Sequence, residues 1–192
     1  MKDERYRWPE GKVPYEIDSS LEEHKDAIQK AINHYHATTC VRFIPRTTEK
    51  DYVRFFKGQG CYSRMGRQGG SQVLSLGRGC HSVGVIIHEM GHALGFYHEQ
   101  NRSDRDEYLI VYLYNVKDGM HFNFQKLHPS QNILYNKFDY DSIMIYGNTA
   151  FSKDGKSPTM VARNGQKLLY AWDKNGMTKS DIERVKMMYK CP

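Results

Sequence analysis

The sequence has no long apolar run, and its first residues do not have the pattern of a leader peptide. Nowhere in its 192 residues do apolar side chains continue for the ~18 positions that a membrane-spanning helix needs, so we expect no membrane segment. The first residues do not form a basic segment followed by an apolar one, so we expect a mature form without a secretory signal or a pro-segment.

Motifs for phosphate and nucleic-acid binding are also missing. The formal net charge is +6 and the pI is near 9.0, but the basic residues are scattered, which is typical of a solvated surface. The glycine-rich stretch at residues 58–71 has neither a Gly-Lys-Ser/Thr ending nor Rossmann spacing, so it predicts no phosphate loop. We therefore expect no nucleic-acid partner.

Cysteine is scarce, and its spacing excludes one class of site. The sequence has four cysteines and no Cys-x-x-Cys pair, which argues against a cysteine-based metal site. Four cysteines allow three disulfide pairings, and the residues alone do not choose among them. Disulfides form in an oxidising compartment, so we expect a secreted, extracellular protein. Four reduced thiols in a cytosolic protein are the alternative.

What the sequence does contain is a metal-binding pattern within residues 83–106. His88 and His92 are four positions apart, so on a helix both imidazoles project from one face toward one ion. Gly95 stands where a chain that needs positive φ leaves the helix, and the reversed chain then brings His98 round as a third ligand. A His pair alone is more often an ordinary surface or core pair, but the complete pattern favours a metal site.

The residue types within this pattern indicate the chemistry. Three neutral nitrogens suit Zn²⁺ and leave one coordination position open for water, whose pKa zinc lowers to about 7. Glu89, beside the first ligand, is placed to accept the proton of that water. We therefore expect one Zn²⁺ per chain and an endopeptidase that hydrolyses protein or peptide substrates with Glu89 as general base and acid. The pattern His-Glu-x-x-His-x-x-Gly-x-x-His with a later methionine is the metzincin signature.

Two other classes of function are the alternatives. A zinc-binding but inactive recognition module would keep the ligands and lose Glu89, which is present. A basic nucleic-acid binder would show steep salt dependence and would be indifferent to chelators. Digestion of casein with and without a chelator separates the three hypotheses.

Within the metzincins, the sequence resembles the astacin family over the whole chain. The resemblance rests on Gly-Phe-Tyr-His-Glu at 95–99, on Arg102 with Asp-Arg-Asp at 104–106 and on Ser-Ile-Met-Ile-Tyr-Gly at 142–147. It implies that Glu99 contacts the mature N-terminus and that Met144 lies beneath the zinc. It also implies that Tyr146 is a further zinc ligand that swings away to stabilise the oxyanion. Ile145 departs from the family, which usually has His at this position.

The resemblance also implies a fold and a disulfide pattern. It implies an α+β fold with two lobes around an active-site cleft, in a single domain of residues 1–192. The N-terminal lobe, about residues 1–98, would carry a twisted, mostly parallel sheet with an antiparallel edge strand and two long helices. The C-terminal lobe, about residues 99–192, would be mostly irregular and end in a helix. The implied disulfides are Cys40–Cys191 and Cys61–Cys80, and we expect a monomer.

Substrate contacts follow from the same resemblance. The glycine-rich stretch corresponds to an edge strand along which substrate lies as an added antiparallel strand, which makes Tyr62, Ser63 and Arg64 substrate contacts. Arg64 stands where the family often has an aromatic residue, which leads to the hypothesis of a preference for an acidic or polar group. Ala171 falls near the pocket that follows the scissile bond.

Local patterns predict the individual elements. Pro14 indicates an edge strand or a strand start, Ser20 with Glu23 predicts a capping box, and Thr178 with Asp181 predicts the cap of a C-terminal helix. Strands are expected after the turn at residues 9–11 and at 41–45, 52–57, 72–76 and 108–114. Helices are expected at residues 20–36, at 81–94 and at 116–127, the last with Met120, Phe122 and Phe124 partly buried.

Overall fold

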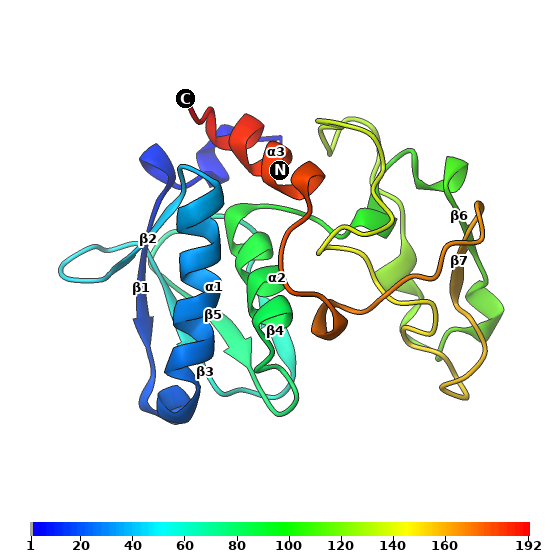
Figure 1. The fold of residues 1–192 in the computed structure, drawn as a ribbon, viewed down its shortest axis with the longest axis horizontal. Helices are drawn as coiled ribbons and strands as arrows, with labels where there is room; N and C mark the ends of the chain where they lie inside the picture. Colours follow the sequence, from blue (N-terminus) through cyan, green and yellow to red (C-terminus); the bar gives the residue numbers. More distant parts are fainter. Residues whose placement is uncertain (1) are drawn as a thin grey trace.

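Five strands form a mixed sheet in the first part of the chain (Figure 1). The structure is a computed structural model and describes residues 2–192. The strand order is β2-β1-β3-β5-β4, in which β4 lies at an edge and pairs antiparallel with β5, while the other pairs are parallel. This confirms the expected mostly parallel sheet with an antiparallel edge strand. The strands are β1 (Lys12–Ile17), β2 (Arg42–Pro45), β3 (Tyr52–Phe56), β4 (Cys61–Ser63) and β5 (Ser71–Leu76).

Two helices pack side by side against this sheet (Figure 1). They are α1 (Lys25–Thr38) and α2 (Val83–Leu94). α1 buries Ile28, Ala31, Ile32 and Tyr35, which recur at the spacing of one helix face. The hydroxyl of Tyr35 donates to the carbonyl oxygen of Ile87 at 2.9 Å, so α1 also holds α2 by a buried hydrogen bond.

The chain after α2 builds a second hydrophobic cluster around a short ribbon. β6 (Leu109–Val111) pairs antiparallel with β7 (Met160–Ala162). Leu109, Phe124 and Leu168 are among the buried residues of this cluster. The remaining elements are 3₁₀ turns: η1 (Glu4–Tyr6), η2 (Pro9–Gly11), η3 (Ser19–His24), η4 (Glu99–Asn101), η5 (Arg105–Glu107), η6 (Leu113–Asn115), η7 (His121–Phe124) and η8 (Ala171–Asp173).

The last helix, α3 (Lys179–Tyr189), brings the end of the chain back to the first cluster (Figure 1). It begins with the predicted capping box. Oγ1 of Thr178 accepts from the backbone N–H of Asp181 at 3.0 Å, and Oδ2 of Asp181 accepts from the backbone N–H of Thr178 at 3.1 Å. None of the helices within residues 2–192 combines the length and the apolar character needed to cross a membrane.

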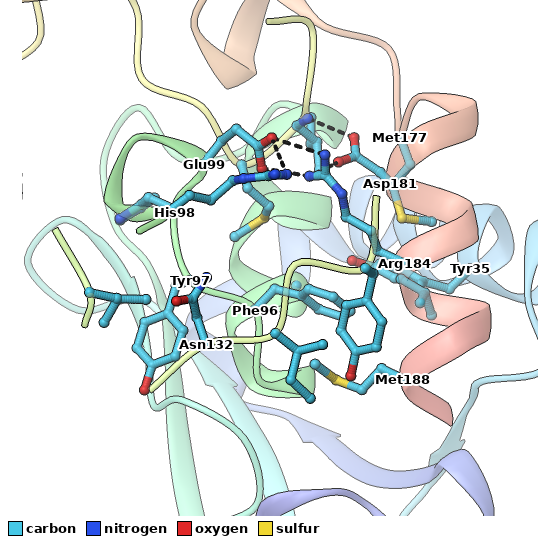
Figure 2. Close-up of a pocket in the computed structure, with 18 residues that line it drawn as sticks. Tyr35, Phe96, Tyr97, His98, Glu99, Asn132, Met177, Asp181, Arg184 and Met188 are labelled. Atoms are coloured by element: carbon cyan, nitrogen blue, oxygen red, sulfur yellow. Dashed lines mark hydrogen bonds and ion pairs between the residues drawn. The ribbon is translucent and has the colours of Figure 1, made fainter. Parts of the chain in front are cut away.

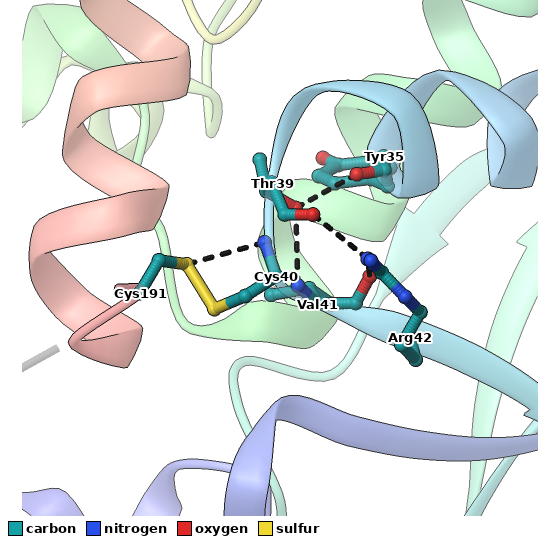
Figure 3. Close-up of a disulfide and its surroundings, with 6 residues drawn as sticks. All are labelled: Tyr35, Thr39, Cys40, Val41, Arg42 and Cys191. Carbon is teal, nitrogen blue, oxygen red and sulfur yellow. Dashed lines mark hydrogen bonds between the residues drawn. A yellow bond between two sulfur atoms is a disulfide. The ribbon is translucent and has the colours of Figure 1, made fainter.

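All four cysteines form disulfides, in the pairs that the resemblance implied. Cys191, just after α3, joins Cys40 at the end of α1, with 5.4 Å between the two Cα atoms (Figure 3). The backbone N–H of Cys40 also donates to the sulfur of Cys191 at 3.2 Å. Cys61 joins Cys80 and thereby ties β4 to the segment that leads into α2.

The expectation that Pro14 marks an edge strand or a strand start is wrong. β1 lies inside the sheet between β2 and β3, and Pro14 is its third residue. Pro14 is in register with Ile44 of β2, whereas β3 pairs with β1 only from Tyr15 onward. Proline, which has no N–H, therefore stands where only one neighbouring strand is paired.

The capping box predicted from Ser20 and Glu23 does not form. The backbone N–H of Ser20 donates to Oδ1 of Asp18, and Oγ of Ser20 accepts from the backbone N–H of Lys57 at the end of β3. Because these partners hold Ser20 in the turn η3, the α-helix begins only at Lys25.

The helix predicted at residues 116–127 is also wrong. Val116 forms an antiparallel bridge with Ser152, and only the short turn η7 is helical in this stretch. A bridge to a distant segment occupies backbone groups that a helix would need. Phe124 is buried as expected, but Met120 and Phe122 are 37% and 66% exposed.

Candidate functional site

Helix α2 carries the first part of the site on a buried helix face. Ser82 caps it, with Oγ accepting from the backbone N–H of Val85 at 3.3 Å. Every residue from Gly84 to Leu94 is buried, so His88, Glu89 and His92 are held by packing on all sides of the helix.

Gly95 ends the helix and turns the chain toward the third histidine. Its φ of 107° and ψ of 18° lie in the left-handed region, where glycine carries no Cβ penalty. The carbonyl oxygen of Phe96, just after the turn, accepts from Nδ1 of His92 at 2.7 Å. The turn therefore orients His92 and at the same time brings His98 to the helix, as the spacing predicted.

The three imidazoles converge on one point. Nε2 of His98 lies 3.1 Å from Nε2 of His88 and 3.0 Å from Nε2 of His92. Nδ1 of His88 lies 2.7 Å from the carbonyl oxygen of Ile143, which can only accept, so its proton is assigned to Nδ1, as for His92. The Nε2 lone pairs of His88 and His92 therefore point at the same small volume beside Nε2 of His98, where a single cation could bind all three nitrogens.

Burial keeps these histidines neutral. It lowers the pKa of His88 to about 3 and that of His92 to about 4, and it lowers the pKa of His98 well below its ordinary value. Neutral imidazole is the form that binds a metal ion. The donor set also fits zinc in geometry, because nitrogen ligands arranged tetrahedrally around zinc lie about 3.3 Å apart.

Glu89 has an unpaired oxygen in the same place. The residue is 5% exposed, and Oε2 has no hydrogen-bond partner among residues 2–192. Burial raises the pKa of Glu89 to about 8. A buried carboxylate without a partner is costly, and a cation or a water molecule held beside it removes that cost. The histidines and this orphan oxygen together fit a zinc site with catalytic water.

The turn around Met144, residues 142–147, is the methionine turn, and it packs directly beneath the metal ligands. A Cβ on Gly91 would lie 2.8 Å from the sulfur of Met144, so this glycine allows the turn to approach α2. The carbonyl oxygen of Met144 accepts from the backbone N–H of Glu99 at 3.0 Å, one residue after the third histidine. The turn thus supports both His88, through Ile143, and the segment that carries His98.

Tyr146 lies against the third histidine. The ring centroids of Tyr146 and His98 are 4.4 Å apart, and the backbone N–H of Tyr146 donates to Oε1 of Gln100 at 3.2 Å. Burial raises the pKa of Tyr146 above its ordinary value, with the charge of Glu89 as a smaller cause, so its hydroxyl stays protonated at neutral pH. Ile145 is buried in the second cluster, where it has no hydrogen-bonding side chain to offer.

Glu99 is the centre of a buried ion network (Figure 2). Its Oε2 lies 2.5 Å from Nη1 of Arg184, and its Oε1 accepts from Nη2 of Arg184 at 2.9 Å and from the backbone N–H of Asp139 at 2.9 Å. Arg102 adds a longer bond of 3.2 Å. The resemblance implied that Glu99 contacts the mature N-terminus; the first residue of the sequence, Met1, lies outside the described residues, so this contact stays a prediction.

The metal site opens into a cleft with a volume of about 580 Å³. Tyr62 and Ser63 of β4 line it, and Ala171 of η8 lines it as well, so three of the predicted substrate contacts lie around the three histidines. Arg64 is exposed and is not among the lining residues, whereas Met65 is. The hypothesis that Arg64 selects an acidic or polar group therefore has no support in this arrangement.

Several supporting residues were missed by sequence reasoning. Gln100 holds Tyr146, Arg184 binds Glu99, and Lys174 donates from Nζ to the carbonyl oxygen of Ser142 at 2.7 Å. No pattern of neighbouring residues in the sequence indicates these roles, because each residue contacts a partner that is distant in the chain. Asp181 had one signal, the capping box, but its contacts with Ser142 and Ile143 were not visible in it.

The chain is similar to a known protein family and to characterised proteins. A family model described as Astacin, a family of peptidases, matches residues 1–190. Astacin-like metalloprotease toxin 1 from Loxosceles intermedia is 44% identical over 196 residues, which covers 100% of this chain and 74% of the toxin. Zinc metalloproteinase nas-15 from Caenorhabditis elegans is 39% identical over 196 residues, which covers 100% of this chain and 34% of that protein.

A solved structure is similar over the same length. High choriolytic enzyme 1, a hatching enzyme zinc-protease from Oryzias latipes, has a TM-score of 0.91 at 37% identity, and the match covers 100% of this chain and 99% of that one. The similarity thus extends through sequence and fold from one end of the chain to the other.

Proposed function

Because the chain belongs to the astacin family and is a zinc metalloprotease that hydrolyses peptide bonds, we propose that Glu89 is its general base and acid and that Tyr146 stabilises the oxyanion. The observation that carries this proposal is the convergence of three Nε2 atoms beside an unpaired Glu89 oxygen in an open cleft.

The roles of the chain's own residues follow from their positions. When bound by His88, His92 and His98, zinc supplies a polarised water molecule and a Lewis acid for the scissile carbonyl group. Glu89 directly follows His88 and lines the same cleft. Its carboxylate accepts the proton of the attacking water and then donates it to the leaving amine.

Tyr146 is the second catalytic residue in this proposal. Its ring packs against His98 and it lines the cleft, so its protonated hydroxyl is available to donate to the oxygen that gains charge in the transition state. Gln100 and His98 fix its backbone and its ring, respectively. The loss of such a donor typically costs about 10²- to 10³-fold in rate.

The substrate lies along β4 in this proposal. β4 pairs with β5 on one side only, so its other edge is free to pair with an extended peptide. An antiparallel peptide would run past Tyr62 and Ser63 and cross the metal site toward Ala171. Main-chain pairing of this kind suits protein and peptide substrates of many sequences.

The wider setting is part of the same proposal. Two disulfides favour secretion, because such bonds persist in an oxidising environment. We treat residues 1–192 as a single catalytic domain that acts as a monomer, with lobes of about 1–98 and 99–192 on the two sides of the cleft. Two separate hydrophobic clusters support this division, although α3 packs on the first of them.

Two variants test the catalytic assignment. In Glu89→Gln we expect a normal fold and zinc content, with casein hydrolysis lower by about 10²- to 10⁴-fold. In Tyr146→Phe we expect kcat to fall by about 10²- to 10³-fold with little change in KM. Tyr114→Phe, at a residue that is 73% exposed, is the control. Near-normal activity of Glu89→Gln, or hydrolysis by the wild type that a chelator leaves unchanged, would contradict the proposal.

A further inference from the structure

Two aromatic rings stack at the rim of the cleft. The ring centroids of Tyr170 and Trp172 are 4.1 Å apart and their planes differ by only 8°. Both residues line the cleft, yet Trp172 is 57% exposed. A large indole with one face on a tyrosine and much of its surface in solvent leaves apolar area available to a ligand.

Tyr170 is held next to one catalytic residue. Its hydroxyl lies 2.6 Å from Oγ1 of Thr149. A Cβ on Gly147 would lie 2.5 Å from the ring of Tyr170, so the ring rests directly on the backbone of the residue that follows Tyr146. The ring of Tyr170 is therefore fixed relative to Tyr146.

The turn that carries Trp172 is held next to the metal ligands. A Cβ on Gly84 would lie 2.1 Å from the carbonyl oxygen of Ala171 and 2.4 Å from that of Lys174, so only glycine allows η8 to pack against the first turn of α2. Gly84 precedes His88 by one helical turn. The stack is therefore held on one side by the backbone next to Tyr146 and on the other by the first turn of the helix that carries His88.

The side chains around the cleft are almost all uncharged. Among the described residues that line it, Glu89 is the one acidic residue and no lysine or arginine is present. Tyr62, Phe151 and Trp172 add aromatic surface from three different segments. A charged substrate side chain would lose water here without gaining a partner, whereas an apolar one would only gain contacts.

The path of β4 shows which part of a substrate meets the stack. The disulfide of Cys61 places the start of β4 near the start of α2, and the backbone N–H of Gly66, just after β4, donates to the carbonyl oxygen of His92 near the end of α2. An antiparallel peptide on β4 runs the opposite way. Its residues on the carboxyl side of the scissile bond therefore lie toward Gly84 and η8.

We propose that the stacked pair Tyr170 and Trp172 selects a large apolar or aromatic side chain immediately after the scissile bond and disfavours an acidic one there. This inference rests on the proposed function, since it assumes hydrolysis of a peptide that is bound along β4. It makes Trp172 a specificity-determining residue, with Tyr170 as the surface that holds it in place.

Matched peptides that differ at one position test the inference. Four quenched fluorescent peptides carry Phe, Leu, Ala or Asp immediately after the scissile bond, and cleavage sites are checked by mass spectrometry. For the wild type we expect kcat/KM to be at least about tenfold higher for Phe and Leu than for Asp. In Trp172→Ala we expect the preference for Phe over Ala to fall by about tenfold, while the Ala peptide changes by less than about threefold.

Two further variants separate selection from a general loss of structure. Trp172→Phe keeps an aromatic ring and is expected to retain most of the preference. Tyr114→Ala removes an exposed aromatic residue that does not line the cleft and is expected to leave all four peptides unchanged. An equal loss on every peptide in Trp172→Ala, an unchanged preference in that variant, or a wild-type preference for Asp would overturn the inference.

Failure of the proposed function has a different signature. If the zinc-loaded wild type cleaves neither casein nor any of the peptides, both the proposed protease mechanism and the proposed selectivity are wrong. If it cleaves casein in a chelator-sensitive manner but does not distinguish the four peptides, only the selectivity is wrong.

Discussion

Oδ1 of Asp181 lies 2.6 Å from Oγ of Ser142, and this contact joins the first turn of α3 to the methionine turn. Oδ2 of the same carboxylate accepts from the backbone N–H of Ile143 at 2.8 Å. The carbonyl oxygen of Ile143 in turn accepts from Nδ1 of His88. One residue therefore caps a helix and supports the backbone that orients a metal ligand.

Loss of Asp181 should weaken the fold and the metal site together. Asp181→Ala removes the Asp181 half of the capping box of α3. It also leaves the hydroxyl hydrogen of buried Ser142 and the N–H of Ile143 without their acceptors, so we expect a loss of about 2–4 kcal/mol in the free energy of unfolding. Zinc affinity, measured by competition with a chromogenic chelator, should fall by about 10- to 100-fold. Asp118→Ala, at a side chain that is 91% exposed, should change neither quantity. Unchanged zinc affinity in a destabilised Asp181→Ala would show that the contact of Asp181 with Ile143 does not influence His88.

The ion pair between Glu99 and Arg184 links the segment after His98 to α3 (Figure 2). Arg184→Leu leaves a buried carboxylate with Arg102 as its remaining cationic partner, so we expect a loss of about 3 kcal/mol in the free energy of unfolding. Because Glu99→Gln removes the charge that needs compensation, Arg184→Leu should cost clearly less in that background. Urea unfolding of the four metal-free proteins gives the coupling between the two residues. Additive effects would show that the pair is energetically unimportant.

The sequence allowed the prediction of those parts of the site that depend on neighbouring residues. The spacing of His88 and His92 on a helix, the left-handed turn at Gly95 and the cap of α3 are local, and each is found where it was expected. The contacts that complete the site are not local. His88 finds its carbonyl partner at Ile143, and Glu99 finds Arg184 almost at the end of the chain.

Two of the wrong predictions share a cause with these omissions. Ser20 has the residue type of a helix cap, but its hydroxyl accepts from Lys57 at the end of β3. Residues 116–127 have apolar side chains at plausible helical spacing, but the backbone of Val116 forms an antiparallel bridge with Ser152 in place of a helix. In both cases a partner from elsewhere in the chain overrides the local preference, which a single sequence does not show.

Two histidines of α1 should make the fold sensitive to acid. Nε2 of His34 accepts from the backbone N–H of Met177, and Nε2 of His36 accepts from that of Phe43, both at 3.0 Å. Burial lowers the pKa of both residues below the ordinary value of 6.5, opposed at His34 by Asp181 and reinforced at His36 by Arg42. Between the lowered pKa and 6.5 the unfolded chain binds more protons, so stability rises with pH in this window and is lost as the pH falls through it.

The comparison that isolates this effect uses metal-free protein. The free energy of unfolding of the wild type should be lower at pH 5 than at pH 7.5, and the difference should be smaller in the double variant His34→Gln and His36→Gln. The three metal-site histidines also titrate, but they are present in both proteins, so their contribution cancels. An identical pH dependence of the two proteins would show that His34 and His36 do not contribute.

The glycosylation sequon Asn101-Arg102-Ser103 should remain unmodified in the folded protein. Nδ2 of Asn101 donates to the carbonyl oxygens of Asn123 at 3.0 Å and Gln125 at 2.8 Å, so both of its hydrogens are engaged. A glycan would replace one of these two amide hydrogens and push η7 away from the segment that follows His98. We expect active protein from a glycosylating host to show no mass change with a peptide N-glycosidase. Ser103→Ala, which removes the sequon but keeps the Asn101 contacts, should have the unmodified mass and the same activity. A glycan on active wild-type protein that is missing from Ser103→Ala would show that the Asn101 contacts are dispensable for folding and for catalysis.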